Sequence, residues 1–342
     1  MNILVTGANG QLGRCLRDCK EEYLQPDGYN DEWFWTDVND IDGLHTDKLD
    51  ITDADAVKKY VVDNAISVIV NCAAYTNVDK AEVDQVMAYK LNADAPKNLA
   101  EACKIHGTKL IHISTDYVFN GTSFMPLTED RYTLPTSIYG KSKLEGEQNI
   151  VNSGCKYLIF RTAWLYSEYG NNFVKTMLKL LAENKEINVV NDQIGTPTYA
   201  RDLASLIFNI ITKNGWPRYE NNRPLNKDGI YHFTNEGVCS WYDFATAVKY
   251  YANSDDMFGF DNAIWGKVNG ITTKDYYGDK PHAPRPYYSV LSKEKIKKDF
   301  GDFLWIDHWE NRVNQCVYDI RHNVYPKVNK EETQPEHGER TF

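Results

Sequence analysis

A tyrosine and a lysine stand four residues apart in the segment SIYGKSKLEGE, at positions 137–147. In a helix, positions i and i+4 lie on one face, one turn apart. A lysine held there biases a tyrosine toward its phenolate form, because a nearby positive charge stabilises the ionised phenol. Since an unperturbed phenol titrates near pH ~10, such help would make Tyr139 a useful acid or base beside Lys143. An ordinary surface helix explains the same spacing, so the rest of the chain must decide.

A glycine-rich turn near the N-terminus predicts a dinucleotide site. In MNILVTGANGQLG, Gly7, Gly10 and Gly13 follow a short apolar run and lead into a helical stretch at about 11–22. Their spacing is one residue longer than that of the commoner G-x-G-x-x-G fingerprint. Glycines permit the tight turn and let the backbone approach a pyrophosphate at the helix N-terminus.

Polar residues follow the other predicted strands. Asp37 ends the strand EWFWTD, where its carboxylate can accept hydrogen bonds from the adenosine ribose. The segment 72–76 ends another strand with small residues that let a cofactor ribose pack closely, and 49–53 could flank the adenine or form a helix N-cap. Thr115 ends the strand 108–115, where its hydroxyl can polarise a substrate carbonyl for hydride attack.

The elements that position these residues alternate between strand and helix throughout the N-terminal half. Continuous apolar strands in such an order predict a parallel sheet covered on both faces, with ligands at the carboxyl ends of the strands. We therefore expect an α/β fold, a Rossmann-type doubly wound parallel sheet with a smaller C-terminal substrate-binding lobe. The expected parts are a cofactor domain at 1–165, with later segments returning to it, a region at 166–326 that is mainly substrate lobe, and a flexible tail at 327–342.

Composition excludes several classes of partner. The 342 residues carry a formal charge of −10, which argues against a general affinity for nucleic acid or anionic membranes. The seven scattered cysteines lack metal-ligand spacing and fit a reducing cytosol. No signal peptide or membrane-spanning stretch is evident. We expect a soluble cytoplasmic protein without nucleic-acid or membrane partners.

Together these segments resemble the extended short-chain dehydrogenase/reductases, and among them the dTDP-4-dehydrorhamnose reductase family. The resemblance spans about residues 1–320 and rests most on RTAWLY at 161–166 and DQIGTPT at 192–198, which have no role in a bare Rossmann fold. It implies that the 4-keto group of dTDP-4-dehydro-L-rhamnose accepts hydride from NADPH or NADH, giving dTDP-L-rhamnose.

The resemblance also implies residue roles. Tyr139 would donate a proton to the developing alkoxide, Lys143 would depress the Tyr139 pKa and hold the nicotinamide ribose, and Thr115 would orient the carbonyl. The implied substrate contacts are Thr115, Asp116, Trp164 and Arg285, although Trp164 could be core filling and Arg285 a structural ion pair. The implied cofactor contacts are Gly7, Gly10, Gln11, Leu12, Gly13, Asp37, Asp50, Ile51, Ala73, Ala74, Tyr75, Thr76, Tyr139 and Lys143.

Four residues of the sequence bear on the choice of cofactor and on metal binding. Asp37 should repel a 2′-phosphate whereas Arg14 could reach one, so we expect both NADH and NADPH to work. Some members of the family bind Mg²⁺ between two subunits through glutamates, but Cys15 and Arg201 occupy two of those positions here. Because Mg²⁺ prefers hard oxygen ligands, we expect no metal, and a monomer rather than a metal-linked dimer.

Two other classes of function stay open. A nucleotide-sugar epimerase or dehydratase uses the same scaffold, and Asp116 directly after Thr115 would suit a dehydratase. A cofactor-binding regulatory subunit would also keep the fold, although such proteins commonly lose the tyrosine or the lysine.

Overall fold

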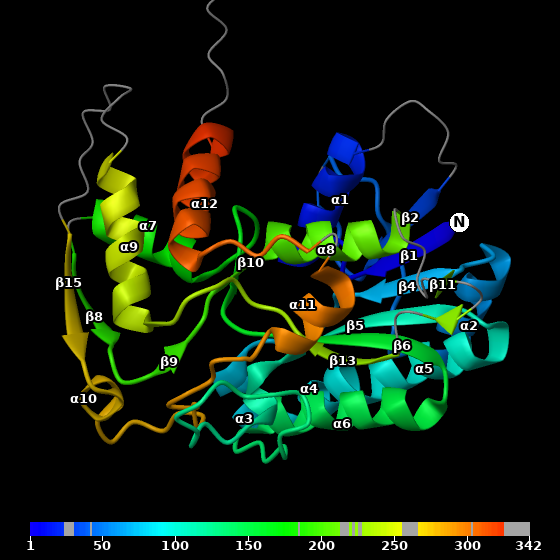
Figure 1. The fold of residues 1–342 in the computed structure, drawn as a ribbon, viewed down its shortest axis with the longest axis horizontal. Helices are drawn as coiled ribbons and strands as arrows, with labels where there is room; N and C mark the ends of the chain where they lie inside the picture. The colour runs from blue at the N-terminus through cyan, green and yellow to red at the C-terminus, as the bar shows by residue number, and fades with distance from the viewer. Residues whose placement is uncertain are drawn as a thin grey trace, which may run out of the picture.

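Figure 1 shows the computed structural model, which describes residues 1–23, 31–41, 43–183, 185–212, 219–220, 223–224, 228–254, 266–301 and 304–324. Its main sheet has seven strands in the order β13-β6-β5-β4-β1-β2-β3, and every neighbouring pair is parallel. The order reverses between β1 and β4, where ligands of such sheets bind. The predicted Rossmann-type doubly wound sheet is therefore confirmed. The strands are β1 (Asn2–Thr6), β2 (Glu32–Asp37), β3 (Asp47–Lys48), β4 (Val68–Asn71), β5 (Lys109–Thr115), β6 (Lys156–Thr162) and β13 (Gly229–His232).

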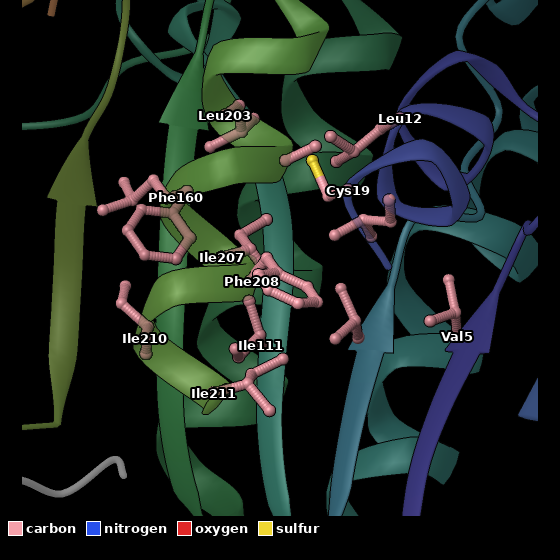
Figure 2. Packing of buried hydrophobic residues seen from close by; sticks show 14 of the residues in the cluster. Val5, Leu12, Cys19, Ile111, Phe160, Leu203, Ile207, Phe208, Ile210 and Ile211 are labelled. Atoms are coloured by element: carbon pink, nitrogen blue, oxygen red, sulfur yellow. The ribbon is translucent and has the colours of Figure 1, made fainter. Parts of the chain in front are cut away.

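One face of this sheet is covered by α1 (Gln11–Tyr23), α8 (Ala200–Thr212) and α11 (Glu294–Phe300). Burying each large apolar side chain stabilises the fold by about 1.5–3 kcal/mol, so this layer fixes α1 and the glycine turn before it. Figure 2 labels ten apolar side chains of this layer: Val5, Leu12, Cys19, Ile111, Phe160, Leu203, Ile207, Phe208, Ile210 and Ile211.

The other face is covered by α2 (Ala54–Asp63), α5 (Ala95–His106) and α6 (Ile138–Ser153). Asp53 caps α2, because its side chain accepts hydrogen bonds from the N–H groups of Asp55 and Ala56. The N-cap interpretation of segment 49–53 is therefore confirmed.

A π-helical turn interrupts the helical region between β4 and β5. This region contains α3 (Val78–Val83), α4 (Gln85–Tyr89), the π-helical η1 (Lys90–Asp94) and α5. Pro96 stands in the first turn of α5 and has no N–H to donate, so the backbone before it cannot keep regular α-helical hydrogen bonding.

A second lobe packs around its own core of helices α7 (Phe173–Ala182), α9 (Trp241–Ser254) and α12 (Trp309–Val324). Its outer strands β8 (Glu186–Val190) and β15 (Lys267–Ile271) pair in parallel, and α10 (Thr273–Tyr277) follows. Two short strand pairs add side chains to this second core: β7 (Leu165–Tyr166) with β10 (Thr198–Tyr199), and β9 (Ile194–Gly195) with β14 (Cys239–Ser240).

Three elements of the C-terminal half join the main sheet: α8 and α11 cover it, and β13 extends it beside β6. The boundary at residue 165 therefore marks where the chain first leaves the sheet, and the assignment of roles to the two parts stays a prediction. The predicted tail at 327–342 lies outside the described residues, and β11 (Tyr219–Glu220) and β12 (Arg223–Pro224) form a separate hairpin. Within the described ranges, no helix is both long and apolar enough to cross a lipid bilayer.

Candidate active site

The glycine turn lies directly against the end of β4. Gly7 has φ +65°, and a Cβ there would lie 2.6 Å from the backbone N of Ala73. A Cβ on Gly13 would lie 2.5 Å from the Cα of Ala8. The first turn of α1 carries no acidic residue, and its N–H groups have no partner within the helix. This cradle fits the pyrophosphate of a dinucleotide.

The other residues at the turn have partners inside the protein. The Gly10 N–H donates to the Gly7 carbonyl at 3.0 Å and closes the turn. The Gln11 side chain is directed toward the second lobe, where its Oε1 accepts from Ser167 and Asn172 at 3.0 and 3.1 Å. Leu12 is buried in the core.

The Asp37 carboxylate accepts three backbone hydrogen bonds near the glycine turn. Its Oδ2 accepts the Asn9 N–H at 3.1 Å, and its Oδ1 accepts the Val38 and Asn39 N–H groups at 2.8 and 3.1 Å. A carboxylate offers about four acceptor positions, so the predicted ribose contact is compatible with these bonds and stays a prediction.

Asp50 and Ile51 lie just before α2. Asp50 accepts from the N–H and hydroxyl of Thr52 at 2.9 and 2.7 Å, and these two bonds lower its pKa. Ile51 is buried, and its carbonyl accepts from Asn98 at 3.2 Å. The adenine contact predicted for this segment is not tested by these bonds.

Asn92, in the π-helical turn, holds the segment after β4 in place. Its side chain pairs with the N–H and carbonyl of Tyr75 at 2.9 and 3.0 Å, and also donates to Ser142 of α6 at 3.1 Å. Ala73, Ala74 and Tyr75 are half-buried there and Thr76 is exposed. A π-turn often marks a functional site, and here it ties the predicted groove to the helix that carries Tyr139.

Tyr139, Lys143 and Glu147 follow one another at i, i+4 and i+8 on α6. Ser137 caps this helix by accepting the Gly140 N–H at 3.1 Å. Lys143 and Glu147 are each only 2% exposed. The face predicted from the four-residue spacing is thus turned into the protein and not toward solvent.

The pKa of Tyr139 is raised to about 12 by burial, while its hydrogen bond with Thr115 acts in the opposite direction. The expectation that Lys143 depresses this pKa is wrong for this structure. The reason is that the Lys143 Nζ lies 2.6 Å from the carbonyl oxygen of Ile113, to which it donates, and 3.3 Å from the His112 Nε2. Tyr139 is therefore a protonated phenol at neutral pH, which is the form that can donate a proton.

Burial also lowers the pKa of Lys143, to about 8, against the opposing effect of the Glu147 charge. A cation that is buried and only partly compensated binds readily to oxygen atoms of a ligand. The lysine thus suits the predicted contact with a ribose.

Thr115 and Asp116 join β5 to Tyr139. The Thr115 hydroxyl donates to Asp116 Oδ1 at 3.0 Å. Burial raises the pKa of Asp116 to about 6, although hydrogen bonds with Ser289 and Thr115 lower it. The other oxygen, Oδ2, is buried without a hydrogen-bond partner. This orphan acceptor beside Thr115 suits a hydroxyl group of a sugar.

Glu147 forms a buried bidentate ion pair with Arg161 of β6. The Arg161 Nε and one terminal nitrogen donate to its two oxygens at 2.9 and 2.7 Å, and the Ser114 hydroxyl also donates to it. This pair anchors α6 across β5 and β6 beneath the reacting groups.

Trp164 connects the two lobes. It has φ +50°, and its ring stacks on Trp241 of α9 with centroids 3.8 Å apart. A Cβ on Gly195 would lie 2.8 Å from the Trp164 ring, so glycine is needed at that position. The half-buried ring packs as the core-filling interpretation predicts, and the sugar contact stays a prediction.

Arg285 forms a bidentate ion pair with Asp79 of α3, with N–O distances of 3.0 and 2.7 Å. It also donates to the Ala283 carbonyl at 3.1 Å and lies over the Tyr277 ring. These contacts support the structural ion-pair interpretation, and the contact with the nucleotide stays a prediction.

The residues expected to affect cofactor choice and metal binding have partners inside the chain. Arg14 lies 4.0 Å from the centroid of the Tyr169 ring. Arg201 pairs with Glu22 and with Glu168, the latter at 3.5 Å. Cys15 is buried, which raises the pKa of its thiol.

Several polar residues of the site received no role in the sequence interpretation, although two of them lie inside the quoted segments 137–147 and 161–166. A buried polar side chain has no sequence pattern of its own that distinguishes it from a core position. They are Asn71, Asn92, His112, Glu147 and Arg161.

Comparisons with known proteins agree with this geometry. The family model of the RmlD substrate binding domain matches residues 1–322. A dTDP-4-dehydrorhamnose reductase of Aggregatibacter actinomycetemcomitans is 40% identical over 87% of this chain and 93% of its own length. A probable dTDP-4,6-dihydroxy-2-methyloxan-3-one 4-ketoreductase of Streptomyces antibioticus is 38% identical over 96% of this chain and 99% of its own.

Solved structures show the same likeness. The crystal structure of a Bacillus anthracis dTDP-4-dehydrorhamnose reductase in complex with NADP is 36% identical, with a TM-score of 0.75 over 93% of this chain and 99% of that one. With a family match over 322 residues and these identities over most of its length, the chain belongs to the dTDP-4-dehydrorhamnose reductase family.

Proposed function

We propose that this enzyme reduces the 4-keto group of dTDP-4-dehydro-L-rhamnose to give dTDP-L-rhamnose, with NADPH or NADH held at the glycine turn. The observation that carries the proposal is the pairing of the half-buried Tyr139 with the buried Thr115 at the carboxyl edge of the sheet, next to Lys143. The family and the named relatives support the same reaction.

The reduced nicotinamide supplies the hydride. Thr115 orients the carbonyl oxygen and turns its hydroxyl proton from Asp116 Oδ1 toward that oxygen as negative charge develops. Tyr139, whose pKa of about 12 keeps it protonated, gives its proton to the resulting alkoxide. Lys143 contributes N–H groups that would hold ribose hydroxyls in place.

On the sugar side, the unpartnered Asp116 Oδ2 accepts a hydroxyl of the substrate. The Trp164 ring, which its stacking on Trp241 holds in place, would contact the sugar. Arg285, held by Asp79, keeps the segment after α10 against α3 and offers its remaining N–H groups to the diphosphate.

A second candidate is reduction of the keto group of a different dTDP-linked deoxysugar. The Streptomyces antibioticus relative favours it, because it is nearly as similar as the rhamnose enzymes and is named as a 4-ketoreductase. The two candidates share the hydride and proton steps and differ only in the sugar ring.

Purified enzyme mixed with NADPH or NADH and each of the two keto sugars distinguishes these functions. We expect loss of reduced-nicotinamide absorbance and a dTDP-L-rhamnose product with the first sugar, at the higher kcat/KM. A higher kcat/KM for the second sugar would establish the other ketoreductase. Epimerised or dehydrated product without cofactor consumption would support the epimerase or dehydratase alternative, and no product at all would leave the regulatory subunit.

We also propose a cytoplasmic monomer that needs no Mg²⁺ and binds no nucleic acid. The internal pairing of Arg201 with Glu22 and Glu168, the seven free cysteines and the net charge of −10 support this. Sedimentation and activity should both be unchanged by EDTA. A dimer that dissociates on chelation would contradict the proposal.

A further inference from the structure

His112, on β5, lies between Asn71 of β4 and Lys143 of α6. Its Nδ1 is 3.0 Å from the Asn71 Nδ2, and its Nε2 is 3.3 Å from the Lys143 Nζ. All three side chains are almost fully buried, with His112 at 0% exposure. Each contact is therefore made without competing solvent.

The position of the His112 proton follows from the orientation of Asn71. The Ala73 backbone N–H can only donate, and it lies 3.2 Å from the Asn71 Oδ1, which also accepts from the Thr6 hydroxyl at 2.7 Å. The Asn71 NH₂ group must then face His112 and donate to Nδ1. A neutral imidazole carries one proton, so Nδ1 as acceptor places that proton on Nε2, toward Lys143.

A charged lysine has no lone pair and cannot accept this Nε2–H. A neutral lysine has one, and its nitrogen can accept from His112 while donating to the Ile113 carbonyl. We propose that His112, locked by Asn71 in its Nε2–H tautomer, is a positioning residue that favours the neutral form of Lys143 and orients its remaining N–H toward the site. This inference rests on the function proposed above only for its effect on activity.

Other titratable groups around Lys143 act in different directions. On its own helix, Glu147 favours the charged lysine, and Arg161 of β6 neutralises part of that effect through the bidentate pair. Tyr139 and, beyond it, Asp116 lie on the substrate side. His112 is the group from β5, and both burial and the Lys143 charge lower its pKa well below the usual value. The imidazole thus stays neutral and keeps its single proton.

The first test measures the tautomer itself and needs no substitution. In the NMR spectrum of protein labelled with ¹⁵N-histidine, His112 should show a protonated Nε2 and an unprotonated Nδ1 across the acid range. His232 is an internal reference of the opposite kind: it is also fully buried, and its Nδ1 contacts the Leu127 carbonyl at 3.1 Å, which requires an Nδ1–H. Two buried, non-titrating histidines with opposite tautomers are expected. A protonated Nδ1 on both would overturn the proposal, whatever the substrate proves to be.

The second test switches the tautomer with Asn71→Asp. The new carboxylate would accept from His112 Nδ1–H and leave the Nε2 lone pair facing Lys143, so the pKa of Lys143 should rise by about one unit or more. NMR of ¹⁵N-lysine would follow this pKa, with Lys143→Met to assign the signal. The pH at which kcat/KM changes should move upward by the same amount.

The matched control is Thr6→Val, which removes one bond to the same Asn71 oxygen but leaves the Ala73 N–H in place. It should leave the tautomer and the Lys143 pKa unchanged. Equal shifts in both variants, or none in Asn71→Asp, would show that His112 only fills space. If the tautomer and the Lys143 pKa behave as expected but no keto sugar is reduced, the proposed function is wrong, whereas the proposed role of His112 holds.

Discussion

Two sets of polar groups gather where α6 packs against β5 and β6, and they differ in how their charges are paired. The supporting set is Glu147, Arg161 and Ser114, in which both carboxylate oxygens accept hydrogen bonds. The reacting set is Tyr139, Lys143, Thr115 and Asp116, which combines pKa values shifted by burial with an orphan oxygen on Asp116.

The difference teaches that burial alone does not decide the role of a charged group; the charge of its partner does. One helical turn separates Lys143 from Glu147, and burial is the same for both at 2% exposure. What differs is the partner: a guanidinium matched to Glu147, against a carbonyl and an imidazole for Lys143. Substitutions in the reacting set should therefore cost activity and spare stability, and those in the supporting set should do the reverse.

The largest effect should come from Tyr139→Phe. Removing the phenol should lower kcat by about 10²–10⁴-fold, because the alkoxide loses its proton donor. Cofactor affinity, measured by fluorescence titration, and the free energy of unfolding should remain nearly unchanged. A variant that keeps more than about a tenth of the activity would contradict the role of Tyr139 as proton donor.

The next largest effect should come from Arg161→Met, which leaves Glu147 charged and buried without its partner. The free energy of unfolding in urea should fall by about 3–5 kcal/mol. The double variant with Glu147→Leu should recover much of this loss, because no buried charge remains. Lys59→Met, which breaks the exposed pair with Asp63, is the control and should change little. An equal loss in Arg161→Met and Lys59→Met would show that the buried pair contributes no more to stability than an exposed one.

Gly7→Ala tests the glycine turn, where one residue affects both the stability of the fold and the binding of the cofactor. Gly107 is a matched position: it has φ +70° but nothing within 4 Å of an added Cβ, whereas Gly7 has φ +65° and a backbone atom at 2.6 Å. Gly107→Ala should cost only the strain of the left-handed conformation, about 1–2 kcal/mol. Gly7→Ala should cost more and also weaken cofactor binding, measured by denaturation and titration. Equal losses would mean that the turn can move away from β4.

The smallest effect, and one of opposite sign, should come from Asp116→Asn. The pKa of Asp116 is raised to about 6 in the folded protein, so its contribution to stability is full below its ordinary value and is lost as pH rises through about 6. Compared with wild type, the variant should therefore gain about 1–3 kcal/mol at neutral pH and little or nothing near pH ~4. Its kcat/KM should fall. A variant that is less stable than wild type at neutral pH would show that the Asp116 carboxylate is a supporting group.

Local patterns in the sequence determined the main sheet and the positions of the reacting groups. Apolar runs followed by glycine, small or hydroxyl residues identified β1, β4 and β5, and the spacing of Tyr139 and Lys143 placed them on one helical face. These features depend on residues that are close in the chain, so period and turn chemistry suffice to read them.

Only the tertiary structure decided which partners those groups have. The contacts of Lys143 with His112 and Ile113, of Glu147 with Arg161, and of Arg285 with Asp79 join segments up to 206 residues apart. The tertiary structure also reversed the expected direction of the Tyr139 pKa, because burial outweighs any help from a lysine that is bonded elsewhere. Burial and long-range hydrogen bonds depend on how the strands and helices pack, and no spacing along the chain encodes them.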